Sequence, residues 1–128
     1  MTYFSLLLLG KIAGSLVLFV LPMLVLPQAR LDRLLGQTSS SPAMYRLYGT
    51  AVLALLVAYA WGIVMAERGE MPWGIVATGL VSNAGGLLVM VVTGMIAKAR
   101  TSAIFIGCVA VGLCAVSVMP NLALRSAF

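Results

Sequence analysis

Four long apolar segments divide the chain, and the short segments between them carry most of its charges. The apolar segments cover about residues 3–26, 43–66, 72–97 and 101–119. A helix needs roughly 20 apolar residues to cross about 30 Å of hydrocarbon, and a backbone in lipid must satisfy its own hydrogen bonds. The pattern therefore predicts an all-α protein in which residues 1–128 form one domain, an integral membrane bundle of four transmembrane helices.

The segment after the first apolar stretch has a different periodicity. Over residues 28–35, three leucines share one face of a helix and charged residues lie around the other face: Leu31, Leu34 and Leu35 against Arg30, Asp32 and Arg33. This arrangement is typical of a short amphipathic helix in the membrane interface. Gly36 is expected to end that helix, and the composition of residues 38–42 predicts a loop.

The third apolar segment carries no charge and holds one strongly polar side chain, Asn83, near its middle. Small residues let helices approach closely, and an amide at this depth needs a protein or water partner. We expect this helix to lie inside the bundle, with Gly79, Ser82 and Gly86 on a packed face. Asn83 is interpreted as a hydrogen-bonding partner for a neighbouring helix, as part of a polar pathway, or as a contact for a cofactor or lipid.

Stripes of small residues recur on the other three segments and predict close helix packing. The first segment has a Gly-x-x-x-Gly pair, and the spacing on the fourth suits left-handed packing at about +20°. The stripes comprise Gly10 and Gly14; Ala51, Ala54, Ala58 and Gly62; and Ala103, Gly107, Ala110, Cys114 and Ser117.

Lys11 lies within the first apolar segment, about 12 Å along the helix from residue 3 at roughly 1.5 Å per residue. Three interpretations are open. The side chain extends along the helix to the nearer headgroup layer, as long basic side chains can. Alternatively, the cation lies inside the bundle and faces an anionic ligand or Asn83, or the helix begins later than residue 3.

The composition is that of a membrane protein: 62% of the residues are hydrophobic, 9% are charged and the mean hydropathy is +1.13. An ordinary soluble domain has about 25% charged residues. The net charge of +5 does not come with a basic face interleaved with aromatic residues, which argues against nucleic-acid binding. The expected partners are membrane lipids, together with other membrane protein subunits or further copies of this chain.

Positive charges are distributed unequally between the two sides of the predicted bundle. We expect the protein to lie in a bacterial inner membrane. Because cytoplasmic loops carry the excess of Lys and Arg, the sequence predicts that loops one and three are cytoplasmic and that both termini are on the opposite, outer side. The basic residues of these loops are expected to contact lipid headgroups. They are Arg30, Arg33, Arg46, Lys98 and Arg100, whereas the opposite side has Arg68 and Arg125.

Residues suited to acid–base or metal chemistry are scarce in the apolar segments. The chain has no histidine, and its three acids, Asp32, Glu67 and Glu70, lie in predicted loops. Cys108 and Cys114 would point about 240° apart on a helix and could not pair within it. Membrane enzymes and pumps depend on ionisable groups inside the spans. We therefore expect no catalytic residues, no metal site, no cofactor and no enzymatic activity.

Three short motifs follow one another in the first half of the chain: Pro27 to Gly36, Ser41-Pro42, and Arg46-Leu47-Tyr48-Gly49 at the start of the second span. Their order resembles that of the DoxX-like and DUF4345-like small four-helix bacterial membrane proteins. In those families a proline often ends helix one, a Leu-Gly loop follows, and Arg-x-x-Gly opens helix two. The resemblance implies a four-helix bundle rather than a particular activity.

These patterns together predict a non-enzymatic membrane protein that is an accessory or assembly subunit of a larger membrane complex. The alternative is a small oligomeric channel or transporter for an anion or a neutral solute. In that alternative Lys11 and Asn83 line the path, with Ser82 and Thr78 one helical turn away.

Overall fold

The structure is a computed structural model that describes residues 1–35 and 41–127. Four of its helices are long and apolar enough to cross a membrane: Tyr3–Val25, Pro42–Glu67, Trp73–Val92 and Arg100–Val118. The prediction of an all-helical protein with four helices long and apolar enough to cross a membrane is therefore confirmed. Gly36 and most of the loop predicted for residues 38–42 lie outside the described residues.

The first membrane-crossing helix contains a wider π turn near its end. It consists of α1 (Tyr3–Ser15), η1 (Leu16–Val20) and α2 (Leu21–Val25), and Thr2 caps its start by accepting a hydrogen bond from the backbone of Ser5. Pro22 has no N–H, and its ring would clash with the carbonyl four residues earlier in a regular α-helix. A π turn directly before it relieves that conflict and bends the helix locally.

The amphipathic segment that follows forms α3 (Gln28–Leu35). Leu31 is buried on its inner face. The Tyr45 hydroxyl donates a hydrogen bond to Asp32 Oδ1, which joins α3 to α4 (Pro42–Glu67). The helix itself is thus present where the leucine spacing places it.

The third membrane-crossing helix, α5 (Trp73–Val92), ends before the predicted boundary at residue 97. The chain turns at Gly94, whose φ of 69° is in the left-handed region that favours glycine. A short 3₁₀ segment, η2 (Met95–Ala97), then leads into α6 (Arg100–Val118) and α7 (Pro120–Ala123). Because Met95 and Ile96 are as apolar as the helix, hydropathy alone does not show where α5 ends.

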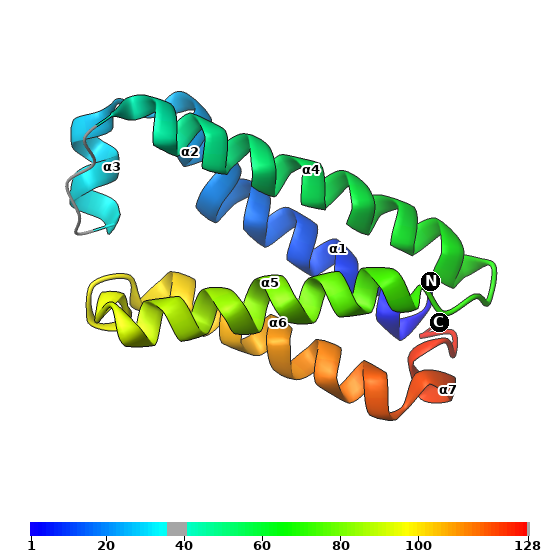
Figure 1. The fold of residues 1–128 in the computed structure, drawn as a ribbon. Helices are drawn as coiled ribbons and strands as arrows, with labels where there is room; N and C mark the ends of the chain where they lie inside the picture. The colour runs from blue at the N-terminus through cyan, green and yellow to red at the C-terminus, as the bar shows by residue number, and fades with distance from the viewer. Residues whose placement is uncertain (36–40, 128) are drawn as a thin grey trace.

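The helices form two antiparallel pairs, α1 with α4 and α5 with α6 (Figure 1). The pairs meet at the end that holds both termini, which we call the closed end. They separate towards the end that holds α3 and η2, which we call the open end (Figure 1). Although a short loop joins α4 to α5, these two helices make few contacts with each other, and α1 contacts α6 instead.

Hydrogen bonds to the Glu67 carboxylate hold the closed end together. The carboxylate accepts hydrogen bonds from the Thr2 backbone and the Ser5 hydroxyl, so the start of α1 is joined to the end of α4. The C-terminal segment lies against the same start, because the Tyr3 N–H donates to the Arg125 carbonyl at 3.2 Å. Phe4 and Leu8 are fully buried beside this cluster.

Close helix contacts in the core pair one large side chain with one glycine. A Cβ atom added at Gly79 of α5 would lie 2.7 Å from Leu113 Cδ1, and one added at Gly112 of α6 would lie 2.8 Å from Leu7 Cδ1. Carbon atoms in van der Waals contact lie about 3.5–4.0 Å apart. At these two positions even a Cβ atom would force the end of a leucine side chain to move, and a larger side chain would require a larger shift.

The predicted small-residue stripes mostly do not make these contacts. Gly14 and Gly62 do, but other members face open space or the outside: Gly10, Gly86 and Gly107, where an added Cβ would meet nothing within 4 Å, and Ala51, Ala54 and Cys114, which are exposed. The prediction that Gly86 lies on a packed face is wrong. The spacing of small residues does not reveal which of them receives a large side chain from another helix.

We predict that Gly79→Leu destabilises the protein and that Gly86→Leu does not. Overpacking a filled core costs about 1–3 kcal/mol, and of these two glycines Gly79 alone has a side chain at contact distance. The measurement is thermal unfolding of both variants in one detergent. A Gly79→Leu variant as stable as the wild type, or a loss of stability in Gly86→Leu alone, would contradict the packing described here.

Candidate functional site

Lys11 lies inside the bundle and its side chain is 6% exposed. Its Nζ donates a hydrogen bond of 2.9 Å to Asn83 Oδ1 and lies 4.8 Å from the centre of the Tyr59 ring. Two of the three interpretations of Lys11 are therefore wrong. The helix begins at residue 3, and the ammonium does not extend to the headgroups, because it finds an amide acceptor and an aromatic face across the bundle.

Asn83 connects Lys11 to a small polar cluster on α5. Its Nδ2 donates to the Gly79 carbonyl at 2.6 Å and to Ser82 Oγ at 3.3 Å. The Tyr59 hydroxyl and Ser82 Oγ share a hydrogen bond of 3.2 Å. Residues of three helices, α1, α4 and α5, thus meet in one hydrogen-bonded group at the centre of the protein. Asn83 does bond to a neighbouring helix, as one of its three interpretations states.

This cluster lies about half-way along the membrane-crossing helices. At roughly 1.5 Å per residue, Lys11 is about 12 Å from the start of α1 and Asn83 about 15 Å from the start of α5. The three acids of the chain, all within the described residues, are elsewhere: Asp32 bonds to Tyr45, Glu67 holds the closed end, and Glu70 is exposed. The Lys11 ammonium has no carboxylate from the described chain beside it.

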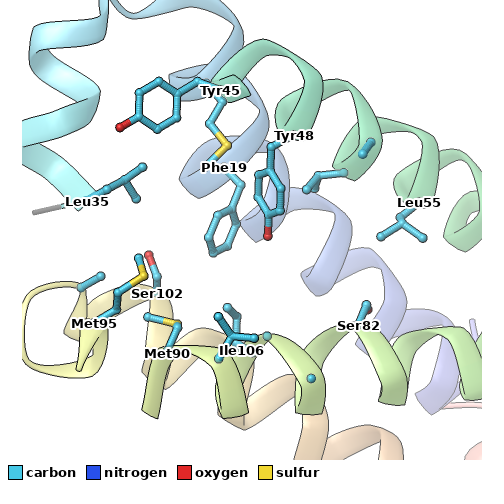
Figure 2. A pocket seen from close by; sticks show the side chains of 17 residues that line it. Phe19, Leu35, Tyr45, Tyr48, Leu55, Ser82, Met90, Met95, Ser102 and Ile106 are labelled. Atoms are coloured by element: carbon cyan, nitrogen blue, oxygen red, sulfur yellow. The ribbon is translucent and has the colours of Figure 1, made fainter. Parts of the chain in front are cut away.

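A cavity of about 530 Å³ opens between the two helix pairs at the open end. Figure 2 shows Phe19 and Tyr48 directed from the α1–α4 side towards Met90 and Ser102 on the α5–α6 side. Most of the lining is apolar, with hydroxyl groups contributed by two tyrosines and two serines: Tyr45, Tyr48, Ser82 and Ser102.

The apolar cavity borders the polar cluster. A smaller cavity of about 70 Å³ is lined by Lys11, Ser15 and Asn83, and it shares Phe19, Tyr48 and Ser82 with the large one. Lys11 and Ser15 are four residues apart on α1 and therefore share one helix face. The buried cation thus lines a small cavity that adjoins the large apolar one.

Two other predicted site residues, Thr78 and Gly86, do not belong to the polar cluster. Thr78 is exposed on α5, and its hydroxyl donates to the Gly74 carbonyl of its own helix. The prediction that it accompanies Ser82 beside the path is wrong. Gly86, predicted to pack, lines both cavities instead. Thr78 precedes Ser82 by four residues and is rotated from it by only about 40°, but it is rotated by about 140° from Asn83, and its side chain is exposed.

Arg46 binds the backbone rather than standing free for headgroups. Its guanidinium donates to the Met23 carbonyl at 2.6 Å and to the Leu26 carbonyl at 3.0 Å. The last carbonyls of a helix have no partner within it, so Arg46 satisfies the end of α2 and fixes the start of α4 against it. The remaining predicted headgroup residues, Arg30, Arg33, Lys98 and Arg100, are exposed.

Tyr59 and Phe19 are site residues that the sequence pattern did not reveal. Tyr59 is 1% exposed, covers the Lys11 ammonium and bonds to Ser82. A signal existed for it, because a hydroxyl far from both ends of an apolar span needs a partner. Phe19, whose ring lies 6.4 Å from that of Phe105, gave no comparable signal. An aromatic residue in an apolar span is equally suited to lipid.

The described residues contain no group of three or more His, Cys, Asp or Glu side chains that could hold a metal ion. Cys108 and Cys114 are free and exposed. What the site offers chemically is a positive charge, hydrogen-bond donors and an apolar cavity.

Comparison with known proteins adds no relative to this description. No protein-family model matches the chain, and searches of curated proteins and of solved structures found no similar one. The resemblance to the DoxX-like and DUF4345-like proteins therefore stays a prediction.

We predict that Lys11 and Asn83 are energetically coupled. Asn83→Leu leaves the buried ammonium without its amide acceptor, and Lys11→Met leaves the amide oxygen unpaired, so each change destabilises the protein. The double variant should lose less than the sum of the two, by about 1–2 kcal/mol, as contacting polar residues do. Unfolding of the four proteins in one detergent measures this difference. Additive losses would contradict a direct bond.

Proposed function

We propose that this chain is a non-enzymatic integral membrane protein that serves as an accessory or assembly subunit of a larger membrane complex. The observation that supports the proposal is the outward position of small residues. Ala54 on α4 and Cys114 on α6 are exposed, and Gly10 on α1 meets nothing within 4 Å. Small residues let membrane helices approach closely. The chain's own helices leave these positions free, so they suit a helix of another subunit or a second copy.

The polar side chains of the interior also suit a protein that works by binding. Lys11, Asn83, Ser82 and Tyr59 are joined to one another by hydrogen bonds or ring contact. They offer donors and a charge, which orient and hold a partner group.

We further propose a location in the bacterial inner membrane with the open end in the cytoplasm. Four exposed basic residues belong to α3, to the connection after η2 and to the start of α6 at this end: Arg30, Arg33, Lys98 and Arg100. A cavity of about 400 Å³ there is lined by Lys98, Arg100 and apolar residues of α2 and α3. Basic groups beside apolar surface suit anionic lipid headgroups, and α3 would lie in that interface.

A channel or transporter for an anion or a neutral solute is the second candidate, and the Lys11–Asn83 pair at mid-depth is the observation in its favour. A path would have to continue from this pair to the closed end, where Phe4, Leu8 and Leu113 are fully buried. If the chain transports a solute, flux into liposomes should differ between the wild type and the Lys11→Met, Asn83→Leu double variant. Equal flux would remove this candidate.

If the chain is an accessory subunit, we predict that it purifies in mild detergent as part of a complex. Ala54→Leu should weaken that association at least tenfold without lowering the melting temperature, because the position is exposed in the single chain. Val57→Leu is the matched control, because Val57 is also exposed but its side chain is already large. This variant should change neither the association nor the melting temperature. Native mass spectrometry measures the association. A wild-type monomer with no partner would count against the proposal.

The proposed orientation predicts different labelling of two loops. In a cysteine-free background, a cysteine at Arg100 should be protected from a membrane-impermeant maleimide in intact cells, whereas one at Glu70 should react. Both positions are exposed and lie at opposite ends of the bundle. Labelling of the Arg100 position from outside, with protection at Glu70, would reverse the proposed orientation.

A further inference from the structure

The cavity between the helix pairs has the size and character of a ligand site. Its volume of about 530 Å³ lies within the roughly 300–1,000 Å³ of small-molecule pockets, which are mostly apolar with a few placed polar groups. Its walls include Met23, Met90 and Met95, and the unbranched methionine side chain adapts to irregular apolar guests.

The smaller cavity that adjoins this one is lined by a positive charge, the Lys11 ammonium. An ammonium group has three N–H donors, and within the described residues Lys11 has one amide acceptor, Asn83, and one aromatic face, Tyr59. Burying a charge is costly unless it is paired. A neutral side chain could bond to Asn83 without that cost, so the positive charge is explained by a negative partner that comes from outside the chain.

We propose that the cavity binds a single-chain anionic amphiphile, a long-chain alkyl carboxylate. Its carboxylate reaches the smaller cavity and accepts hydrogen bonds there from Lys11 Nζ and the Ser82 hydroxyl, while its alkyl chain occupies the adjoining apolar cavity. Charge complementarity selects an anion, and the position of Lys11 at mid-depth selects a small headgroup. A phospholipid headgroup is larger and belongs at the membrane surface, where Lys98 and Arg100 lie.

The test of this site is separate from that of the accessory role, because Ala54, the position changed to test association, lines neither of the two cavities. The failure of either proposal therefore leaves the other standing.

Photolabelling of the full chain in phosphatidylcholine nanodiscs tests the proposal. The probes are a long-chain alkyl carboxylic acid with a diazirine near the middle of its chain, and the primary alcohol and primary amine of the same chain. We expect the acid to label residues of the cavity wall, such as Met90 and Ile106, at concentrations at least tenfold below those needed for the alcohol or the amine. Peptide mass spectrometry locates the label.

Two matched pairs of variants test separately how the Lys11 charge and the cavity volume contribute to labelling. Lys11→Met should reduce labelling by the acid at least tenfold, to the level of the alcohol, and Arg68→Met, an exposed cation at the closed end, should leave it unchanged. Gly86→Leu should fill the cavity and also abolish labelling by the acid, whereas Gly10→Leu adds the same side chain outside the cavity and should not. An added Cβ meets nothing within 4 Å at either glycine, so both leucine variants should fold.

Three results would overturn the proposal. One is equal labelling of the cavity by the acid and the alcohol in the wild type. Another is labelling spread over lipid-facing positions such as Val57 and Val81, which would show partition into the bilayer only. The third is undiminished labelling by the acid in a folded Lys11→Met or Gly86→Leu variant. If Lys11→Met does not fold, the comparison of Gly86→Leu with Gly10→Leu still tests whether the acid binds in the cavity.

Discussion

The Lys11 ammonium is a positive charge buried about half-way along the membrane-crossing helices. Placing a lysine at the centre of a membrane helix costs about 2.5–3.5 kcal/mol on insertion scales, and the structure meets that cost with polar side chains from other helices. Asn83 supplies the acceptor and Tyr59 supplies an aromatic face. Because these groups come from α5 and α4, this one interaction links α1, α4 and α5. The same interaction holds the cation beside the apolar cavity.

The two ends of the bundle differ because their contacts differ. At the closed end, Leu7 of α1 packs against Gly112 of α6, and the Tyr3 N–H donates to the Arg125 carbonyl, so the helix pairs are held together. Towards the open end, Arg46 and Tyr45 bind α2 and α3, within their own half of the protein. The pairs separate there, and the space between them is the cavity. The Lys11–Asn83 pair therefore lies where the two helix pairs begin to separate, and the cavity lies beyond it towards the open end.

Much of the fold could be predicted from the sequence, because hydropathy and length decide which segments cross a membrane. The four crossings and the helix at residues 28–35 follow from simple patterns. The packed faces did not follow, since Gly79 and Gly86 look alike in sequence and only the position of Leu113 distinguishes them. For the site, Lys11 and Asn83 were recognisable as polar residues in apolar segments. Their direct contact, the role of Tyr59 and the outward direction of Thr78 depend on helix rotation, which composition does not encode.

Solid-state NMR of the protein in lipid bilayers can show whether the Lys11 ammonium is buried and bonded to Asn83. With nitrogen labels on lysine side chains and carbon labels on asparagine side chains, the account predicts a dipolar contact between Lys11 Nζ and the Asn83 carboxamide carbon, as the 2.9 Å hydrogen bond requires. Asn83→Leu should abolish that contact and identify it. If the Lys11 nitrogen instead shows contacts to lipid phosphate and none to Asn83, the ammonium lies at the headgroups and the account of a central buried cation is wrong.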